Sequence, residues 1–138
     1  MGIAGNYTKY LVREALKGIV VDQTGKPVPI NPNFMTIQKN DLPVFPVITL
    51  GMKGHLRDDE IGEEQRLYLS VWSKSGQTEL WFIYNQVRAL LNLNSFPGSE
   101  ETDFHQIALM REVFTDDNLY NEKTFTFQLA TRYKIDYV

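Results

Sequence analysis

The sequence contains no cysteine, which excludes disulfides, zinc–thiolate sites and thiol chemistry. It also lacks an apolar run long enough to span a membrane as a helix. The opening residues, MGIAGN, have neither the basic start nor the apolar core of a signal peptide. These absences predict a protein without thiol sites and without a membrane segment.

Motifs for nucleotide binding and nucleophilic catalysis are missing as well. Thr24-Gly25-Lys26 resembles part of a phosphate-binding loop, but the preceding glycine is replaced by Val20 and the lysine is followed by Pro27. The segment Ser73–Gly76 joins a strand pattern to a helix pattern, but it lacks the Gly-x-Ser-x-Gly elbow that exposes a nucleophile. We therefore interpret the first segment as a turn and the second as a structural joint with Ser75 as the helix cap.

Metal-binding patterns are also absent. The acidic residues between positions 58 and 64, and the run 116–118, lack the alternating ligands and mid-loop glycine of a calcium loop. His55 and His105 are isolated in the sequence, without the paired spacing of zinc ligands. The sequence thus predicts no catalytic residue, no cofactor and no metal, and we expect the protein not to be an enzyme.

What is present is the composition of an ordinary globular domain. The 138 residues are 43% hydrophobic, 22% charged and 12% aromatic, which argues against disorder and predicts one domain over residues 1–138. The net charge of −3 argues weakly against a nucleic-acid-binding protein, which usually has a basic face.

Two amphipathic segments predict helices. Residues 7–20 place apolar side chains at helical spacing, and so do residues 77–92. The predicted core stripe of the first is Leu11, Val12, Ala15, Leu16 and Ile19; that of the second is Leu80, Ile83, Tyr84, Val87, Leu90 and Leu91. Between them, residues 22–32 contain three prolines and predict a turn-rich connector.

Alternating segments predict strands at residues 43–50, 66–72, 105–114 and 123–135, with a short edge strand at 34–38. Residues 43–50 and 66–72 are predicted to pair as an antiparallel hairpin with a long tip, the acidic excursion 51–65. The polar run 115–122 is predicted to join the last two strands. The order α-β-β-α-β-β indicates an α+β domain in which two helices pack on a mostly antiparallel sheet of four to five strands.

Two apolar surfaces remain after the core stripes are filled. On a helical wheel, Phe82 points away from the core stripe, and Trp81 and Arg88 flank it. Tyr68 and Trp72 project from the strand face opposite its core residues. Aromatic residues and arginine are favoured in protein interfaces, so these residues, with Arg57, Asp58, Asp59 and Glu60 of the excursion, are the candidate interface. An exposed aromatic without function is the alternative.

The layout is similar to that of the tail-terminator, or tail-completion, proteins of long-tailed bacteriophages and related gene-transfer particles. The resemblance lies in the "PVFPVITLG" strand, the charged excursion, the segment Leu69–Ser75 that leads into the second helix, and the closing "FTFQLATRYKI" strand. It covers residues 7–138 by pattern.

This resemblance implies a structural virion protein at the head–tail junction, assembled in the host cytoplasm. It would form a homo-hexameric ring that caps the tail tube, ends polymerisation of the tube protein and contacts the head connector or stopper. DNA would pass through its lumen without specific binding. The alternatives are another neck component, such as a head-completion or tail-tube protein, and a small ligand-binding α+β domain.

Overall fold

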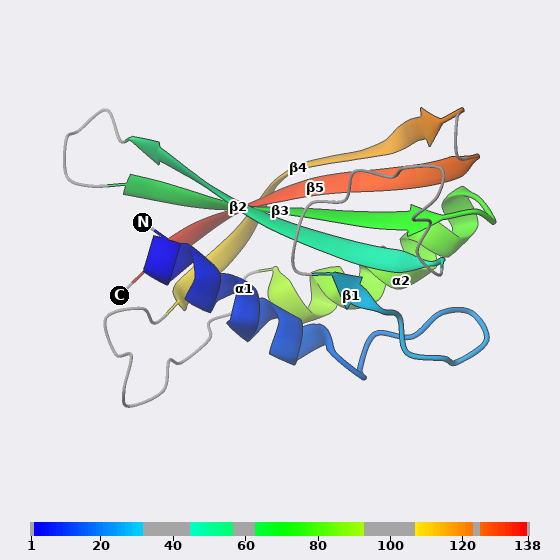
Figure 1. The fold of residues 1–138 in the computed structure, drawn as a ribbon, viewed down its shortest axis with the longest axis horizontal. Helices are drawn as coiled ribbons and strands as arrows, with labels where there is room; N and C mark the ends of the chain where they lie inside the picture. The colour runs from blue at the N-terminus through cyan, green and yellow to red at the C-terminus, as the bar shows by residue number, and fades with distance from the viewer. Residues whose placement is uncertain (1, 32–44, 57–62, 93–106, 123–124, 138) are drawn as a thin grey trace.

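The computed structural model describes residues 2–31, 45–56, 63–92, 107–122 and 125–137. Two helices and five strands follow the order α1 (Gly2–Leu16), β1 (Ile30–Asn31), β2 (Val47–Leu56), β3 (Glu63–Ser73), α2 (Gln77–Leu91), β4 (Ile107–Asn121) and β5 (Thr126–Tyr137). Figure 1 shows both helices on one side of the sheet, which leaves the other side without a helix. The α+β class, the five strands and the two helices agree with the sequence-based prediction.

The strands form one sheet in the order β1-β2-β3-β5-β4. The pairs β2–β3, β3–β5 and β4–β5 are antiparallel, whereas β1 pairs parallel with β2. The sheet is therefore mixed, although only the two-residue β1 departs from the antiparallel pattern. β1 lies within the segment predicted as a connector, and the predicted edge strand at 34–38 lies outside the described residues.

The core fills the space between the helices and the sheet. α2 contributes the larger share, because one continuous stripe of five side chains along it is completely buried. β3 and β5 alternate as predicted, with every second side chain against the helices. The buried hydrophobic residues that form this core include Val12, Leu16, Leu50, Leu67, Leu69, Val71, Leu80, Ile83, Tyr84, Val87, Leu91, Leu129, Tyr133 and Ile135.

The prediction that residues 51–65 form a loop between two strands was wrong for most of these residues. Residues 51–56 continue β2 and residues 63–65 begin β3, in register from Gly51 opposite Tyr68 to Leu56 opposite Glu63. Glycines and charged residues obscured the strand pattern, but cross-strand hydrogen bonds depend on backbone groups that every residue except proline supplies. Antiparallel pairing of the two strands is confirmed, and only 57–62 separates them.

Two other boundaries also differ. The polar run 115–122 was predicted as a connection, but β4 continues to Asn121, past the last of its three register shifts, which lies between Asp116 and Leu119. Bulges of this kind let an edge strand contain polar residues while still pairing. In the first helix the chain leaves the helical path after Leu16, so Ile19, predicted as core, is 57% exposed and Val20 is buried instead.

A buried tyrosine cluster, two candidate interaction surfaces and the fold comparison

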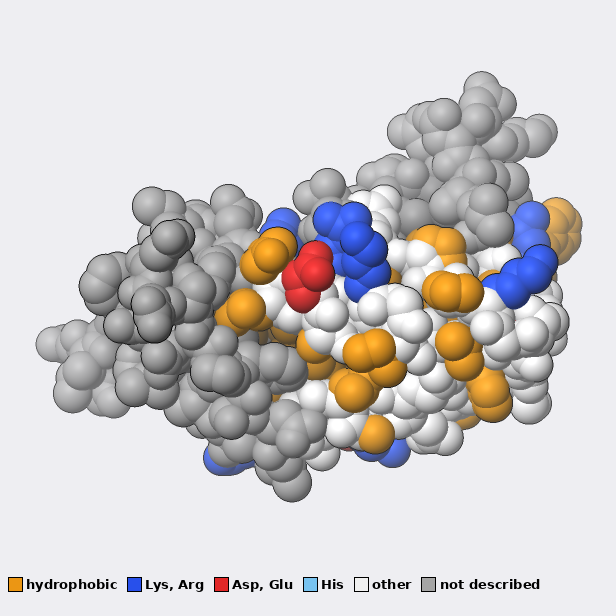
Figure 2. Space-filling view, turned by 90° about the horizontal axis from the view of Figure 1, so that it is seen from below, with side chains coloured by type: hydrophobic (Ala, Val, Ile, Leu, Met, Phe, Trp, Pro, Cys, Tyr) orange, Lys and Arg blue, Asp and Glu red, His pale blue; other side chains and the backbone are white. Residues whose placement is uncertain are grey.

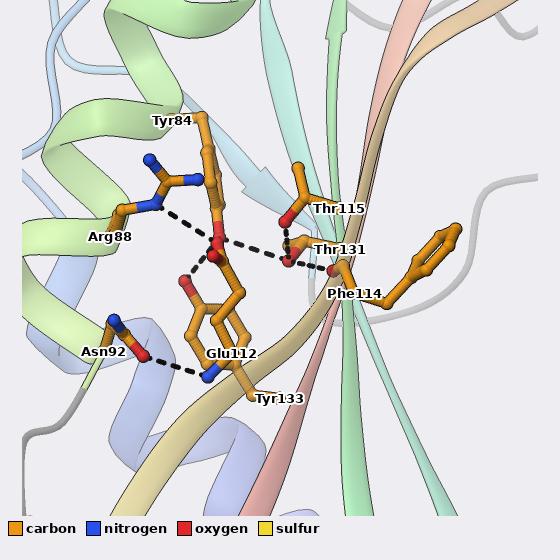
Figure 3. A network of polar contacts seen from close by, with 8 residues as sticks. All are labelled: Tyr84, Arg88, Asn92, Glu112, Phe114, Thr115, Thr131 and Tyr133. Carbon is orange, nitrogen blue, oxygen red and sulfur yellow. Dashed lines mark hydrogen bonds and ion pairs between the residues drawn. The ribbon is translucent and has the colours of Figure 1, made fainter.

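A polar cluster joins α2 to β4 and β5 beneath the helices, as Figure 3 shows. The Tyr84 hydroxyl donates to the carboxylate of Glu112 and lies 2.7 Å from the Tyr133 hydroxyl and 3.1 Å from that of Thr131. The Arg88 Nε donates to the same Glu112 carboxylate at 3.2 Å. We call these five residues the tyrosine cluster.

The surroundings of the tyrosine cluster keep both phenols neutral. Burial raises the pKa of Tyr84, and the hydrogen bond to Glu112 raises it further. Burial raises the pKa of Tyr133 strongly, with the neighbouring Tyr84 as the next cause. Side chains from α2, β4 and β5 satisfy one another here. This arrangement stabilises the packing of α2 on the sheet, because a buried polar network contributes most when every member is paired.

The joint between β3 and α2 is held by a local hydrogen-bond pair. The Ser73 hydroxyl donates to Glu79 at 2.7 Å and accepts from the Ser75 backbone N–H at 2.9 Å. The residue that caps α2 is Gly76, at φ 123° and without a side-chain cap, so the predicted cap at Ser75 was wrong. A positive φ of this size favours glycine, and Ser73 rather than Ser75 supplies the fixing hydroxyl.

On the outer side of α2, Phe82 is exposed, whereas Trp81 and Arg88 contact neighbouring side chains. Phe82 is 42% exposed, as the helical wheel predicts. Trp81 donates from Nε1 to Asp117 at 2.6 Å, and the Arg88 guanidinium lies 5.3 Å from the Trp81 ring centre. Figure 2 shows this helix-bearing side, where hydrophobic side chains lie in separate groups. Of the three candidates on α2, Phe82 is the side chain most available to a partner.

The side of the sheet without helices forms the second surface, which we call the open face. Tyr68 and Trp72 both lie on it, half-buried, and Trp72 donates from Nε1 to Thr49 at 3.0 Å. A shallow hollow of about 380 Å³ follows the strands there. It is lined by Thr49, Tyr68, Ser70, Trp72, Phe114, Gln128, Ala130, Thr131 and Arg132.

Arg132 and Phe114 belong to the open face but were not among the sequence-predicted candidates. The Arg132 guanidinium lies 4.3 Å from the centre of the Phe114 ring and 5.8 Å from that of Tyr68. The alternation of β5 puts Arg132 on this face, so that signal was available in the sequence. Phe114 was hidden by the register shift after Glu112. Arg57, Asp58, Asp59 and Glu60 lie outside the described residues.

Among the described residues, no group of three or more His, Cys, Asp or Glu side chains is arranged to hold a metal ion. No helix in that part of the chain is long and apolar enough to cross a membrane. The features that stand out are therefore the two surfaces and the tyrosine cluster.

Comparison with solved structures defines the class of fold. The chain superimposes on one from the "Virion of native gene transfer agent (GTA) particle" with a TM-score of 0.59 and 11% identity, covering 97% of this chain and 92% of that chain. At this identity the likeness is one of fold. The sequence matches no protein-family model and no curated protein.

Proposed function

We propose that this protein is a structural component of a phage-like virion. The observation that carries the proposal is the fold likeness to a chain of the gene transfer agent virion, which spans nearly the whole length of both chains. The pattern of the sequence supports the same class.

Within that class, we propose that it acts as a tail terminator. It forms a homo-hexameric ring on the finished tail tube, ends polymerisation and presents a second surface to the head connector. A ring requires two different surfaces on each subunit, because a head-to-tail contact joins unlike patches. The outer side of α2 with Phe82 and the open face with Tyr68 and Trp72 lie on opposite sides of the domain and meet this requirement.

The proposal includes no catalytic step and no cofactor. The tyrosine cluster is the most chemically distinctive group, yet its hydroxyls bond one another and Glu112. None of its five residues except Thr131 lines the hollow on the open face. We therefore assign the tyrosine cluster a stabilising role, and we assign the proposed function to the two surfaces of the domain.

The test is to produce particles in the host that encodes the protein after deleting its coding sequence. A tail terminator predicts tubes of uncontrolled length that are not joined to heads, and complementation should restore uniform tails. Tails of normal length that remain unattached to heads would instead indicate a head-side neck component. Normal, infectious or transfer-competent particles would contradict the proposal.

A further inference from the structure

A groove of about 330 Å³ lies between the end of α1 and the segment that leads into β1. Figure 1 shows β1 near the C-terminal end of α1. The described residues that line the groove come from both segments: Arg13, Lys17, Gly18, Pro27, Val28, Pro29 and Ile30. None of them lines the hollow of the open face, so the two sites are separate. We call this site the edge groove.

The charged side chains that line the edge groove are basic. The Lys17 N–H donates to the Arg13 carbonyl at 2.8 Å, so the two side chains lie one helical turn apart, on the same side, where like charges repel. Arg13 is half-buried and Lys17 is exposed. Within the part of the chain that the structure describes, neither forms a salt bridge with a carboxylate. A carboxylate from outside the domain would therefore be attracted to both.

The rest of the edge groove is apolar. Val28 is buried, and Ile30 packs against the hydrophobic core. Pro27 and Pro29 are exposed, and a proline supplies no N–H to a ligand. The edge groove therefore suits an apolar side chain with a carboxylate beside it better than it suits a uniformly charged polyanion.

The backbone of β1 indicates which form such a ligand takes. Ile30 lies opposite Ile48 of β2, whose N–H donates to the Pro29 carbonyl at 2.9 Å. In this parallel pairing Ile48 bonds the residues on either side of Ile30, so the N–H and C=O of Ile30 point away from β2. β1 is the outermost strand of the sheet, and among the described residues these two groups have no partner. Such groups on an edge strand can pair with an added strand.

We propose that the edge groove binds an extended acidic peptide segment of a partner protein, which adds as a strand along β1. The backbone of the segment pairs with Ile30, and one apolar side chain enters the groove. Side chains two positions apart on a strand point the same way, so an acidic residue two positions from the apolar one meets Arg13 or Lys17. The inference goes beyond the proposed function and does not depend on a ring, because the single chain carries the whole site.

The test is a fluorescence-anisotropy titration of a labelled, end-blocked peptide of sequence Asp-Ser-Val-Ser-Asp with the purified protein at about 20 mM salt. Saturable binding is expected, with a dissociation constant below about 1 mM. Arg13→Gln and Lys17→Gln should each weaken it several-fold. Arg111→Gln, which removes an exposed charge from β4 at the opposite edge of the sheet, is the matched control and should leave the affinity unchanged.

Three further peptides separate the parts of the proposal. N-methylation along the peptide backbone removes the donors for strand pairing, Asp-Ser-Ser-Ser-Asp lacks the apolar side chain, and Lys-Ser-Val-Ser-Lys reverses the charge. Each should bind several-fold more weakly than the first peptide. An N-methylated or lysine peptide that binds as tightly as the first would overturn the proposal.

Thermal melting of each variant establishes that it is folded. Absence of saturable binding by the wild type, or an equal loss of affinity in Arg13→Gln and Arg111→Gln, would also overturn the proposal. Peptide binding is measured on the isolated protein and tail length on particles from the host. A failure of the proposed function is therefore distinguishable from a failure of this inference.

Discussion

The hydroxyl oxygens of Tyr84 and Tyr133 lie 2.7 Å apart, a buried polar contact between the middle of α2 and β5. Both rings are completely buried in the core, so their hydroxyls can be satisfied only by protein groups. The Tyr84 hydroxyl bonds Glu112, Thr131 and the Tyr133 hydroxyl. This contact adds a directional link to the apolar packing that holds α2 on the sheet.

Removal of one hydroxyl from this pair should destabilise the domain. Tyr84→Phe removes the hydroxyl that pairs with the buried Tyr133 hydroxyl, whereas Glu112 keeps Arg88 and Thr131 keeps the Phe114 carbonyl. An unsatisfied buried polar group costs about 1–3 kcal/mol, so the urea midpoint should fall with the m-value unchanged. Tyr120→Phe, which removes a hydroxyl from a side chain that is 48% exposed, is the control and should be nearly neutral. Equal midpoints for the two variants would contradict a stabilising role for the cluster.

Stability should also fall at alkaline pH. The pKa values of Tyr84 and Tyr133 are raised in the folded state, whereas an unfolded tyrosine titrates near pH 10. A raised folded pKa gives stability that is fully present below the unfolded pKa and lost as pH rises through the folded pKa. Unfolding measured by urea between about pH 9 and 11 should show a steeper loss for the wild type than for Tyr133→Phe. If stability falls equally with pH in the two proteins, Tyr133 has the same pKa in the folded and the unfolded state, which would contradict this prediction.

A second contact fixes α2 to the chain that follows α1. The Gln86 side chain accepts from the Val21 N–H at 3.0 Å and donates to the Val21 carbonyl at 2.7 Å. Gln86→Met keeps the length of the side chain but leaves both backbone groups unpaired, which should cost about 1–3 kcal/mol. Asn85→Ala, at an exposed position of the same helix turn, is the comparison. If both changes cost the same, the paired hydrogen bonds do not stabilise this junction.

Substitution by aspartate should impair assembly at Phe82 but folding at Leu80. Phe82→Asp should leave the monomer folded, since a surface substitution usually changes stability by about 0.5 kcal/mol, but it should weaken assembly by about 2 kcal/mol or more if Phe82 is an interface anchor. Leu80 is completely buried, so Leu80→Asp should unfold the domain by burying an unpaired charge. Melting temperature and ring formation are measured for both. Phe82→Asp rings that form normally would show that Phe82 is not an anchor.

Much of this fold could be predicted because the spacing of apolar residues along the sequence indicates which side of a helix or strand is buried. The stripe of α2 and the alternation of β3 and β5 were visible in the sequence, since each of these elements has one buried side. The end of β2 and the second half of β4 were missed for one physical reason. Their pairing is made by backbone groups, while many of their residues are polar or glycine, so residues such as Asp116 and Gly54 indicate a loop although they lie in strands.

The functional surfaces were only partly predictable. Phe82, Tyr68 and Trp72 follow from the periodicity of single elements, and the structure places them away from the helix-covered core, as expected. The tyrosine cluster depends on register between strands that are distant in sequence. A single sequence contains no direct signal for register at that range, so the structure was needed to find it.

The most direct test of the account is a reconstruction of the virion that contains this protein. We expect six copies in one ring at the head-proximal end of the tail tube, with the outer side of α2 of each subunit against the open face of its neighbour. Six-fold density into which the fold of this chain fits at that position would support the tail-terminator proposal. A single copy, or absence of the protein from purified particles, would contradict it.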